Sequence, residues 1–226
     1  MINAKNITKT YTNGVIETKV LRGIDIDIQK GEFVAIMGKS GAGKSTLLYQ
    51  LGLLDHPTAG EIFIDGVDVL SLDDREATDF RLNKLGYVFQ DYALVPELTA
   101  QENVMMPLLM LGMTTEDAKA QAAVSLERIG MGHRLNNRPN QLSGGEQQRV
   151  SIARAVVQDP VILFADEPTA NLDSASSEKV LEVFTDLHKE GQTIVMVTHE
   201  KEYTRNCNRI VFLEDGEIVS EEILNN

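Results

Sequence analysis

A glycine-rich octapeptide has the residue types and the spacing of a loop that holds phosphate groups. The segment reads Gly38-Lys39-Ser40-Gly41-Ala42-Gly43-Lys44-Ser45 and matches the pattern G-x-x-x-x-G-K-[ST]. It follows the apolar run at residues 33–37 and precedes a helical pattern at residues 46–54. Glycines let backbone amides curl around phosphate oxygens, while Lys44 neutralises their charge and Ser45 offers its hydroxyl to Mg²⁺. The alternative is a glycine-rich turn that binds nothing, and the full pattern in this context favours phosphate binding.

Two adjacent carboxylates, Asp166 and Glu167, follow an apolar strand pattern at residues 161–165. Such a strand is typical of the segment that holds the metal ion in phosphate-loop enzymes. We therefore expect Asp166 to hold the magnesium shell, and Glu167 to polarise a water for in-line attack on the γ-phosphate. The alternative is a helix start before Pro168, and the presence of the phosphate loop favours the catalytic interpretation.

His199 closes another apolar run, at residues 193–197, where a strand end would place it on the same sheet edge as the phosphate loop. An isolated histidine is more often a hydrogen-bonded structural residue. The position of His199 downstream of the acidic strand favours a role in the chemistry.

Three continuous apolar runs predict the sheet that must position these residues. They cover residues 33–37, 161–165 and 193–197, and continuous runs are typical of strands buried on both faces of a mainly parallel sheet. Residues 24–28 alternate apolar and polar side chains, which predicts a strand with one wet face. The tail, residues 209–218, predicts a strand, a turn at Glu214-Asp215-Gly216 and a second strand.

Helix-forming residues dominate between about residues 91 and 159. Two segments that match the capping box, residues 99–102 and 143–146, mark helix starts there. We therefore expect a single domain, residues 1–226, with a core lobe of about 1–90 and 160–226 and an inserted helical lobe of about 91–159.

Charge and composition exclude several classes of function. Asp and Glu (34) outnumber Lys and Arg (21) and give a formal net charge of −13, so we expect no nucleic-acid partner. The single cysteine, Cys207, cannot form an internal disulfide, which favours a cytoplasmic protein. The first residues lack the apolar stretch of a signal peptide, and the longest apolar run, at residues 104–113, is far short of the ~20 residues that span a bilayer. A membrane role would therefore need a second chain.

A decapeptide near the middle of the chain resembles the signature motif of the ABC ATPases. It reads Asn140-Gln141-Leu142-Ser143-Gly144-Gly145-Glu146-Gln147-Gln148-Arg149. Ser143 and two glycines at a helix start would form a second anion-binding site, because glycine leaves the backbone open. The alternative is an ordinary capped helix. Two phosphate-binding helix starts on one chain favour an ATP-dependent head-to-tail homodimer in which each ATP is shared.

The resemblance covers essentially the whole chain and implies an α/β fold. The implied architecture is a P-loop NTPase (RecA-like) core with a mainly parallel sheet, an N-terminal antiparallel β subdomain and an inserted α-helical subdomain. Tyr11 would stack on adenine, Gln90 would contact magnesium and the attacking water, and residues 170–173 would form the D-loop. The implied site comprises catalytic residues Glu167, His199 and Gln90; ATP contacts Tyr11, Gly38, Lys39, Ser40, Gly41, Ala42, Gly43, Lys44, Ser45 and Thr46; signature contacts to the ATP of the opposing subunit Ser143, Gly144, Gly145 and Glu146; the D-loop residue Asp173; and metal ligands Ser45, Gln90 and Asp166.

Three further segments resemble the ATPases that serve macrolide export, lipoprotein release and cell division: residues 52–61, 98–104 and 139–145. This resemblance implies ATP and Mg²⁺ as cofactors and an integral membrane permease as partner. It also implies a cytoplasmic position, peripheral on the inner face of the membrane through that permease. The implied function is ATP hydrolysis that powers export or extrusion of a substrate such as a lipoprotein, peptide or drug. The alternative is force transmission through a cell-division-type permease without transport.

Other ATPases fit the sequence less well. A DNA-repair or chromosome-organising ATPase would need a long coiled coil between the phosphate loop and the signature, and no sustained heptad is present. A ribosome-acting factor usually carries two cassettes, and a nucleotide kinase would leave the signature without a purpose. The permease is expected to contact residues 90–104, through Tyr92, Leu94, Val95 and Leu98, unless these side chains only pack the helical lobe.

Overall fold

The computed structural model describes residues 1–14 and 16–224, which form two compact units. The first unit comprises Met1–Arg81 and the chain from Gly191 onward, and the second comprises Leu82–Glu190. The lobe boundaries expected from the sequence stay a prediction. The first unit contains, in chain order, β1 (Ile2–Asn13), β2 (Ile16–Ile28), β3 (Phe33–Met37), α1 (Lys44–Leu51), β4 (Ala59–Ile64), β5 (Val67–Asp68), α2 (Asp74–Lys84, whose last residues belong to the second unit), β8 (Thr193–Val197), the 3-10 helix η3 (Lys201–Thr204), β9 (Arg209–Glu214) and β10 (Glu217–Ile223). The second unit contains β6 (Leu85–Val88), α3 (Ala100–Met110), α4 (Thr115–Arg128), η1 (Gly132–Arg134), η2 (Pro139–Gln141), α5 (Gly144–Val156), β7 (Ile162–Asp166) and α6 (Ser174–Lys189).

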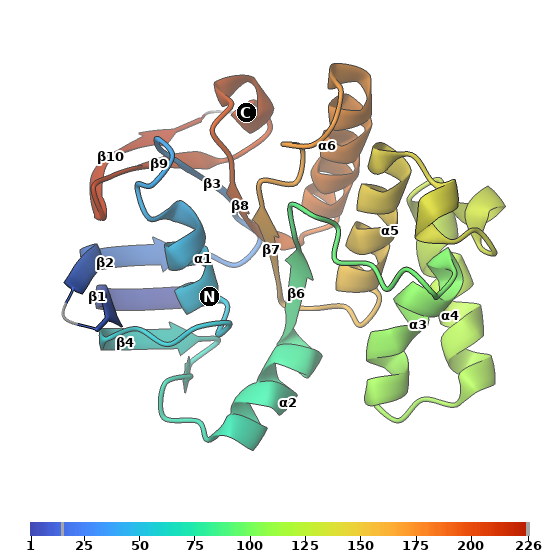
Figure 1. Cartoon of the computed structure of the whole chain (residues 1–226), viewed down its shortest axis with the longest axis horizontal. Coiled ribbons are helices and arrows are strands. Elements are labelled where there is room, and N and C mark those ends of the chain that lie inside the picture. Colours follow the sequence, from blue (N-terminus) through green and yellow to red (C-terminus); the bar gives the residue numbers. More distant parts are fainter. Residues whose placement is uncertain (15, 225–226) are drawn as a thin grey trace. The chain divides into compact units, whose positions relative to one another are not determined.

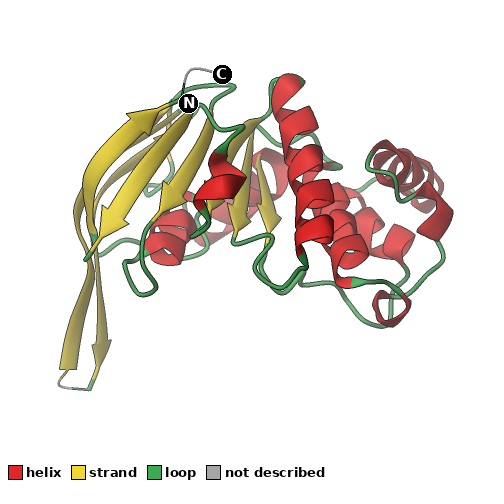
Figure 2. Ribbon diagram, turned by 90° about the horizontal axis from the view of Figure 1, so that it is seen from above, coloured by secondary structure: helices red, strands yellow, loops and turns green. Residues whose placement is uncertain are grey.

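An antiparallel sheet with the strand order β2-β1-β4-β5 forms one layer of the first unit (Figure 1). β1 lies in its middle, where Ile2 is opposite Ile28 of β2 and Ile64 of β4. The isoleucines of residues 24–28 are buried and the aspartates between them are exposed, which confirms the predicted strand with one wet face. In Figure 2 the β1–β2 hairpin extends beyond the other strands of this sheet.

Parallel strands form the second sheet of the first unit. β3 pairs in parallel with β8 on one side and with β9 on the other, so that Ala35 is opposite Met196 and Ile210. Every residue of β3 and β8 is buried, because strands covered on both faces need continuous apolar runs. β10 pairs antiparallel with β9, which confirms the predicted hairpin of the tail.

The second unit combines a parallel strand pair with a helical core. β6 and β7 pair in parallel, with Val88 opposite Ala165. Both predicted capping boxes are present, at Thr99 before α3 and at Ser143 before α5. Within residues 1–14 and 16–224, no helix is long and apolar enough to cross a membrane. The shared core of α3, α4 and α5 includes Val104, Leu108, Ala122, Leu126, Val150 and Ala153.

The helix predicted at residues 46–54 has different bounds in the structure, because α1 begins at Lys44 and ends at Leu51. Its first turn includes the hydrogen bond from the Leu47 amide to the Gly43 carbonyl. Its end is set by Gly52 and by Leu53, whose φ of 58° is left-handed and cannot continue an α-helix. The apolar pattern of the sequence continued past this point, and the prediction was therefore too long.

Two hairpins of the first unit turn on the same dipeptide, Asp-Gly. Asp65-Gly66 joins β4 to β5 and Asp215-Gly216 joins β9 to β10, and in both turns the two residues have positive φ. This geometry is that of a type I′ turn, which favours glycine at the second position. The surroundings of the glycines differ: a Cβ at Gly66 would meet open space, whereas one at Gly216 would lie 2.2 Å from the carbonyl oxygen of Val20.

We predict that Gly216→Ala destabilises the chain much more than Gly66→Ala. Both substitutions place alanine at a left-handed φ, which costs about 1–2 kcal/mol. Only Gly216→Ala adds a clash with backbone, which we expect to cost about 1–3 kcal/mol more. Equilibrium denaturant unfolding of the two variants measures the difference directly. Equal losses of stability would show that the close approach at Gly216 is unimportant.

Candidate nucleotide site

The phosphate loop connects β3 to α1 in the first unit. Gly41 and Gly43 have φ of +81° and +101°, so the loop uses backbone conformations that other residues rarely adopt. The Lys44 side chain is 6% exposed and its Nζ donates a hydrogen bond to the Lys39 carbonyl, 3.2 Å away. The ammonium group is therefore held over the loop, where the resemblance places the phosphates.

The β9–β10 hairpin packs against the backbone of the phosphate loop. A Cβ at Gly38 would lie 2.2 Å from the Leu213 carbonyl oxygen, so only glycine fits between the loop and β9. The Gly216 amide donates to the Ala42 carbonyl (3.1 Å), and the Gly216 carbonyl accepts from the Arg22 amide (2.9 Å). The loop is thus fixed by backbone contacts from a distant part of the chain.

Tyr11 lies on β1 with 45% of its surface exposed, as a residue that stacks on a base requires. Its hydroxyl donates to Asp55 Oδ2 at 2.8 Å, and the ammonium group of Lys9 lies 4.8 Å from the centre of its ring. Neither Asp55 nor Lys9 was expected at the site, because their partners come from different elements and leave no local pattern.

His199 follows β8, and the phosphate loop follows β3. Since β3 and β8 are adjacent and parallel, both segments leave the same edge of the sheet, as the sequence predicted. The His199 side chain is about half exposed (52%), and its Nε2 lies 3.8 Å from Glu200 Oε1. The position fits a histidine that meets a ligand, and its role stays a prediction.

The two acidic candidates end β7 in the second unit. Asp166 is 6% exposed, and Glu167 follows with a left-handed φ of 44°. Such a conformation costs of order 1–3 kcal/mol in a residue other than glycine and is concentrated at functional sites. No helix begins at Pro168, since the next helix, α6, starts at Ser174. The geometry therefore disfavours the alternative of a helix start.

Gln90 lies just beyond β6, the parallel neighbour of β7, and so shares a sheet edge with Asp166 and Glu167. Asn171 of the predicted D-loop holds this segment, because its amide group donates to the Gln90 carbonyl (3.3 Å) and to Asp91 Oδ1 (3.1 Å). The structure thus connects the segment of Gln90 to the predicted D-loop by side-chain hydrogen bonds.

Asp173 forms the N-cap of α6 and accepts the Ser176 amide at 2.9 Å. This hydrogen bond from the Ser176 amide, followed by one from the Ser176 hydroxyl, lowers the pKa of Asp173. A capping aspartate stays ionised at neutral pH, which favours the helix start.

The signature motif forms the N-terminus of α5. Ser143 caps the helix, and its own amide donates to Glu146 at 2.8 Å, which is the main cause of the lowered pKa of Glu146. A Cβ at Gly144 would lie 2.8 Å from the Tyr92 hydroxyl, and one at Gly145 would lie 2.9 Å from the Ser176 side chain. The glycines therefore permit a close approach to the loop that contains Tyr92 and to the start of α6, and Ser143 is exposed.

Arg154 of α5 fixes the segment after Gln90. Its guanidinium donates to the carbonyl oxygens of Ala93 (2.7 Å) and Tyr92 (3.1 Å). Both residues have left-handed φ, 60° at Tyr92 and 50° at Ala93, so they need such support. This role could not be predicted from sequence, because the partners of Arg154 are backbone atoms far away in the chain.

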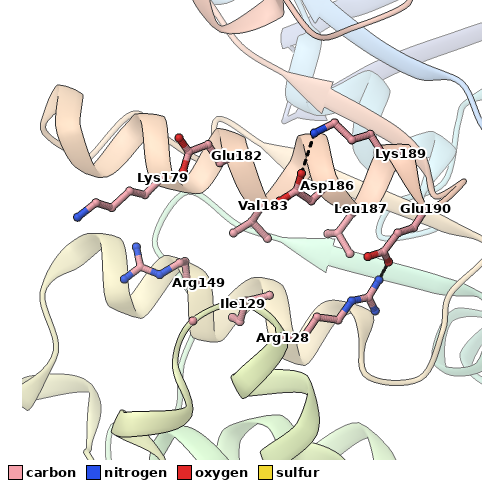
Figure 3. Close-up of a pocket in the computed structure, with 11 residues that line it drawn as sticks. Arg128, Ile129, Arg149, Lys179, Glu182, Val183, Asp186, Leu187, Lys189 and Glu190 are labelled. Carbon is pink, nitrogen blue, oxygen red and sulfur yellow. Dashed lines mark hydrogen bonds and ion pairs between the residues drawn. The ribbon is translucent and has the colours of Figure 1, made fainter.

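A cavity of about 560 Å³ lies in the second unit, and Arg149 at the end of the signature decapeptide is among its lining residues (Figure 3). Its apolar wall is formed by Ile129, Val183 and Leu187. Its charged side chains have both signs, and Arg128 forms an ion pair with Glu190. None of the predicted site residues lines it, so we assign it no part in nucleotide binding.

A family model described as ABC transporter matches residues 21–170. The chain belongs to the ABC transporter family. The lipoprotein-releasing system ATP-binding protein LolD of Aquifex aeolicus is 47% identical to it over 98% of this chain and 97% of that protein. The macrolide export ATP-binding/permease protein MacB of Brucella melitensis is 46% identical over 98% of this chain, which spans only 34% of that longer protein.

A dimeric structure of the ATP-binding cassette MJ0796 bound to ADP and Pi matches this ABC chain with a TM-score of 0.93, at 44% identity and over 100% of both chains. The match confirms the predicted fold class, an ABC ATPase cassette that combines an antiparallel sheet with a mostly parallel one. The family and this cassette together identify the chain as an ATP-binding ABC ATPase. The roles of the individual site residues stay predictions.

We predict that Arg154→Lys loosens the segment after Gln90. Lysine keeps the charge, but a single ammonium group cannot replace the planar fork that binds two carbonyls. Amide hydrogen exchange of residues 91–95 should become about tenfold faster or more, since two charged hydrogen bonds are weakened. Arg128→Lys, which changes an exposed ion pair of α4, serves as the matched control. Unchanged exchange at residues 91–95 in Arg154→Lys would contradict the assignment.

Proposed function

We propose that this chain is the ATPase subunit that powers a separate membrane permease for export or extrusion of a substrate such as a lipoprotein, peptide or drug. The observation that carries the proposal is the presence of two glycine-rich helix starts, at Lys44 and after Ser143, on a chain with the ABC fold. Relatives named for lipoprotein release and macrolide export support the substrate classes. The chain would act at the cytoplasmic face of the membrane, held there by the permease.

ATP binding divides between the base and the phosphates. The exposed ring of Tyr11 offers a stacking surface for adenine. The loop amides from Gly38 to Thr46 face the phosphate oxygens, and Lys44 exchanges its hydrogen bond with the Lys39 carbonyl for contacts to the β- and γ-phosphates.

The predicted ligands of Mg²⁺ fit that ion chemically. Ser45, Gln90 and Asp166 offer a hydroxyl, an amide oxygen and a carboxylate, which are the hard oxygen ligands that Mg²⁺ prefers. Magnesium usually keeps several waters and binds through one or two side chains plus substrate phosphates, so a small protein set is sufficient. When bound, Mg²⁺ would neutralise charge on the β- and γ-phosphate oxygens.

Hydrolysis needs a water aligned with the bond between the γ-phosphorus and the β–γ bridging oxygen. Glu167 orients this water and accepts one of its protons as the oxygen attacks the γ-phosphorus, while the bridging oxygen leaves with ADP. Gln90 follows β6 and Glu167 follows the adjacent parallel strand β7, so both lie at the same edge of the sheet. Gln90 would help to position the water. His199 would contact the γ-phosphate. The products are ADP and inorganic phosphate.

The second anion site explains why the chain would work as a head-to-tail dimer. Ser143 is exposed, and together with the amides at the start of α5 it would bind the γ-phosphate of an ATP held by the phosphate loop of the partner. Two such ATP molecules would join the subunits. The dimeric structures of the ABC cassette MJ0796 support a dimer.

The permease would contact residues 90–104, where the notable side chains are partly exposed. Tyr92, Leu94, Val95 and Leu98 are each half-buried. Arg154 ties the carbonyls of Tyr92 and Ala93 to α5, the helix that begins with the signature. A movement of the signature on ATP binding would therefore be transmitted to this surface.

We predict that Glu167→Gln binds ATP, hardly hydrolyses it and accumulates as a dimer. Glutamine keeps the shape of the site but is a much poorer proton acceptor, so turnover should fall by about 10²–10⁴-fold. Contacts of the γ-phosphate to Lys44 and to the partner's signature would survive. Light scattering after size exclusion, with ATP, with ADP and without nucleotide, should show a dimer only with ATP.

The control adds Ser143→Arg to Glu167→Gln. The bulky arginine should block the signature and leave a monomer even with ATP, while ATP binding at the phosphate loop continues. A dimer that ignores nucleotide, or one that persists with Ser143→Arg, would contradict the shared site without contradicting the ATPase activity.

A further inference from the structure

We propose that Asp55 and Lys9 are positioning residues that hold the Tyr11 ring in place for the base of the nucleotide. The inference rests on the proposed function, because it assumes that Tyr11 stacks on adenine. Neither residue needs to touch ATP. Asp55 anchors the hydroxyl at one end of the ring, and Lys9 lies over one of its faces, which leaves the other face for the base.

The Asp55 carboxylate is the centre of this arrangement, because each of its two oxygens accepts two hydrogen bonds. Oδ2 accepts from the Tyr11 hydroxyl at 2.8 Å and from Gln50 Nε2 at 3.0 Å. Oδ1 accepts from Lys9 Nζ and from the His56 amide, each at 2.8 Å. Four donors from four residues fix the carboxylate in one orientation, and the Tyr11 hydroxyl with it.

Lys9 has two contacts that hold its ammonium group over the ring of Tyr11. Its Nζ pairs with Asp55 and donates to the His56 carbonyl at 2.6 Å. Its side chain is only 12% exposed, whereas that of Asp55 is 32% exposed. A cation 4.8 Å from the ring centre is within the range of a cation–π interaction. An adenine therefore has a single face of Tyr11 on which to stack.

The charges of the group agree with this geometry. Burial would raise the pKa of Asp55, but the hydrogen bonds from Lys9, Tyr11, His56 and Gln50 outweigh it and lower the pKa to about 2. Burial, and then the hydrogen bond and charge of Asp55, raise the pKa of Tyr11. The aspartate is thus ionised and the phenol protonated throughout the neutral range, so the anchor does not vary with physiological pH.

The group also connects the base to the phosphates. Asp55 follows α1, and its amide donates to the carbonyl of Tyr49 on that helix. Gln50, which donates to Asp55, lies on the same helix, and α1 begins with Lys44 of the phosphate loop. The Tyr11 ring is therefore fixed to the helix that holds the phosphates, although Tyr11 itself belongs to β1.

The test compares two ligands, MgATP and inorganic tripolyphosphate with Mg²⁺, which has the phosphates without the base. Asp55→Ala should weaken the binding of MgATP by about tenfold, the value of one lost charged hydrogen bond, and leave the affinity for tripolyphosphate unchanged. Turnover at saturating ATP should stay near that of the wild type, because stacking is equal in the ground and transition states. Asp55→Asn, which keeps an acceptor for the Tyr11 hydroxyl, should recover part of the affinity.

Three further variants serve as controls. Lys9→Met keeps the buried aliphatic part of the side chain and removes the charge. It should also weaken the binding of MgATP but not that of tripolyphosphate, so the test remains possible if Asp55→Ala does not fold. Tyr11→Phe removes the anchored hydroxyl, so Asp55→Asn should add little to its effect in the double variant. Glu222→Gln breaks an exposed ion pair with Lys201 in another part of the first unit and should change the affinity for neither ligand.

The outcomes separate the inference from the proposed function. Selective loss of MgATP affinity in the Asp55 and Lys9 variants supports the positioning role. Unchanged MgATP affinity in folded variants, or equal losses for both ligands, would overturn it. Failure of the wild-type chain to bind MgATP would instead overturn the proposed function.

Discussion

The triphosphate of ATP carries several negative charges, and this chain with its net charge of −13 must hold them without a large basic surface. In the proposed site it would meet the constraint with oriented backbone amides at helix starts and with one buried lysine, Lys44. Amides have to lie close to the phosphates, so the phosphate loop and the signature depend on glycines and on a well-defined backbone conformation. Much of the rest of the structure serves to hold the backbone of these two segments in that conformation.

The supports come from distant parts of the chain. The β9–β10 hairpin approaches Gly38 and bonds to Ala42 through Gly216, while the D-loop and the segment after Gln90 pack against the glycines of the signature. The segment after Gln90 is in turn held by Arg154, and the Tyr11 ring by Asp55. Each support is a contact between elements, so a small shift in one of them would change the geometry of a proposed ligand contact.

Local patterns in the sequence were sufficient for the elements but not for these supports. The buried strands, the capping boxes at Thr99 and Ser143, and the family were predicted, because apolar runs and short motifs reflect nearby residues. The end of the first helix was predicted too late, since the left-handed φ of Leu53 leaves no mark in the apolar pattern. The roles of Arg154 and Asp55 depend on partners dozens of residues away, which a single sequence does not reveal.

The central claim is that one ATP is held by Lys44 of one chain and Ser143 of another, and mixing two inactive variants tests it most directly. Lys44→Ala and Ser143→Arg should each abolish ATPase activity alone. A mixed dimer would contain one intact site, made of Lys44 from the second variant and Ser143 from the first. An equal mixture should therefore regain clear ATPase activity, because each mixed dimer has one intact site, half the number in a wild-type dimer. No activity beyond that of the separate variants would contradict the shared site.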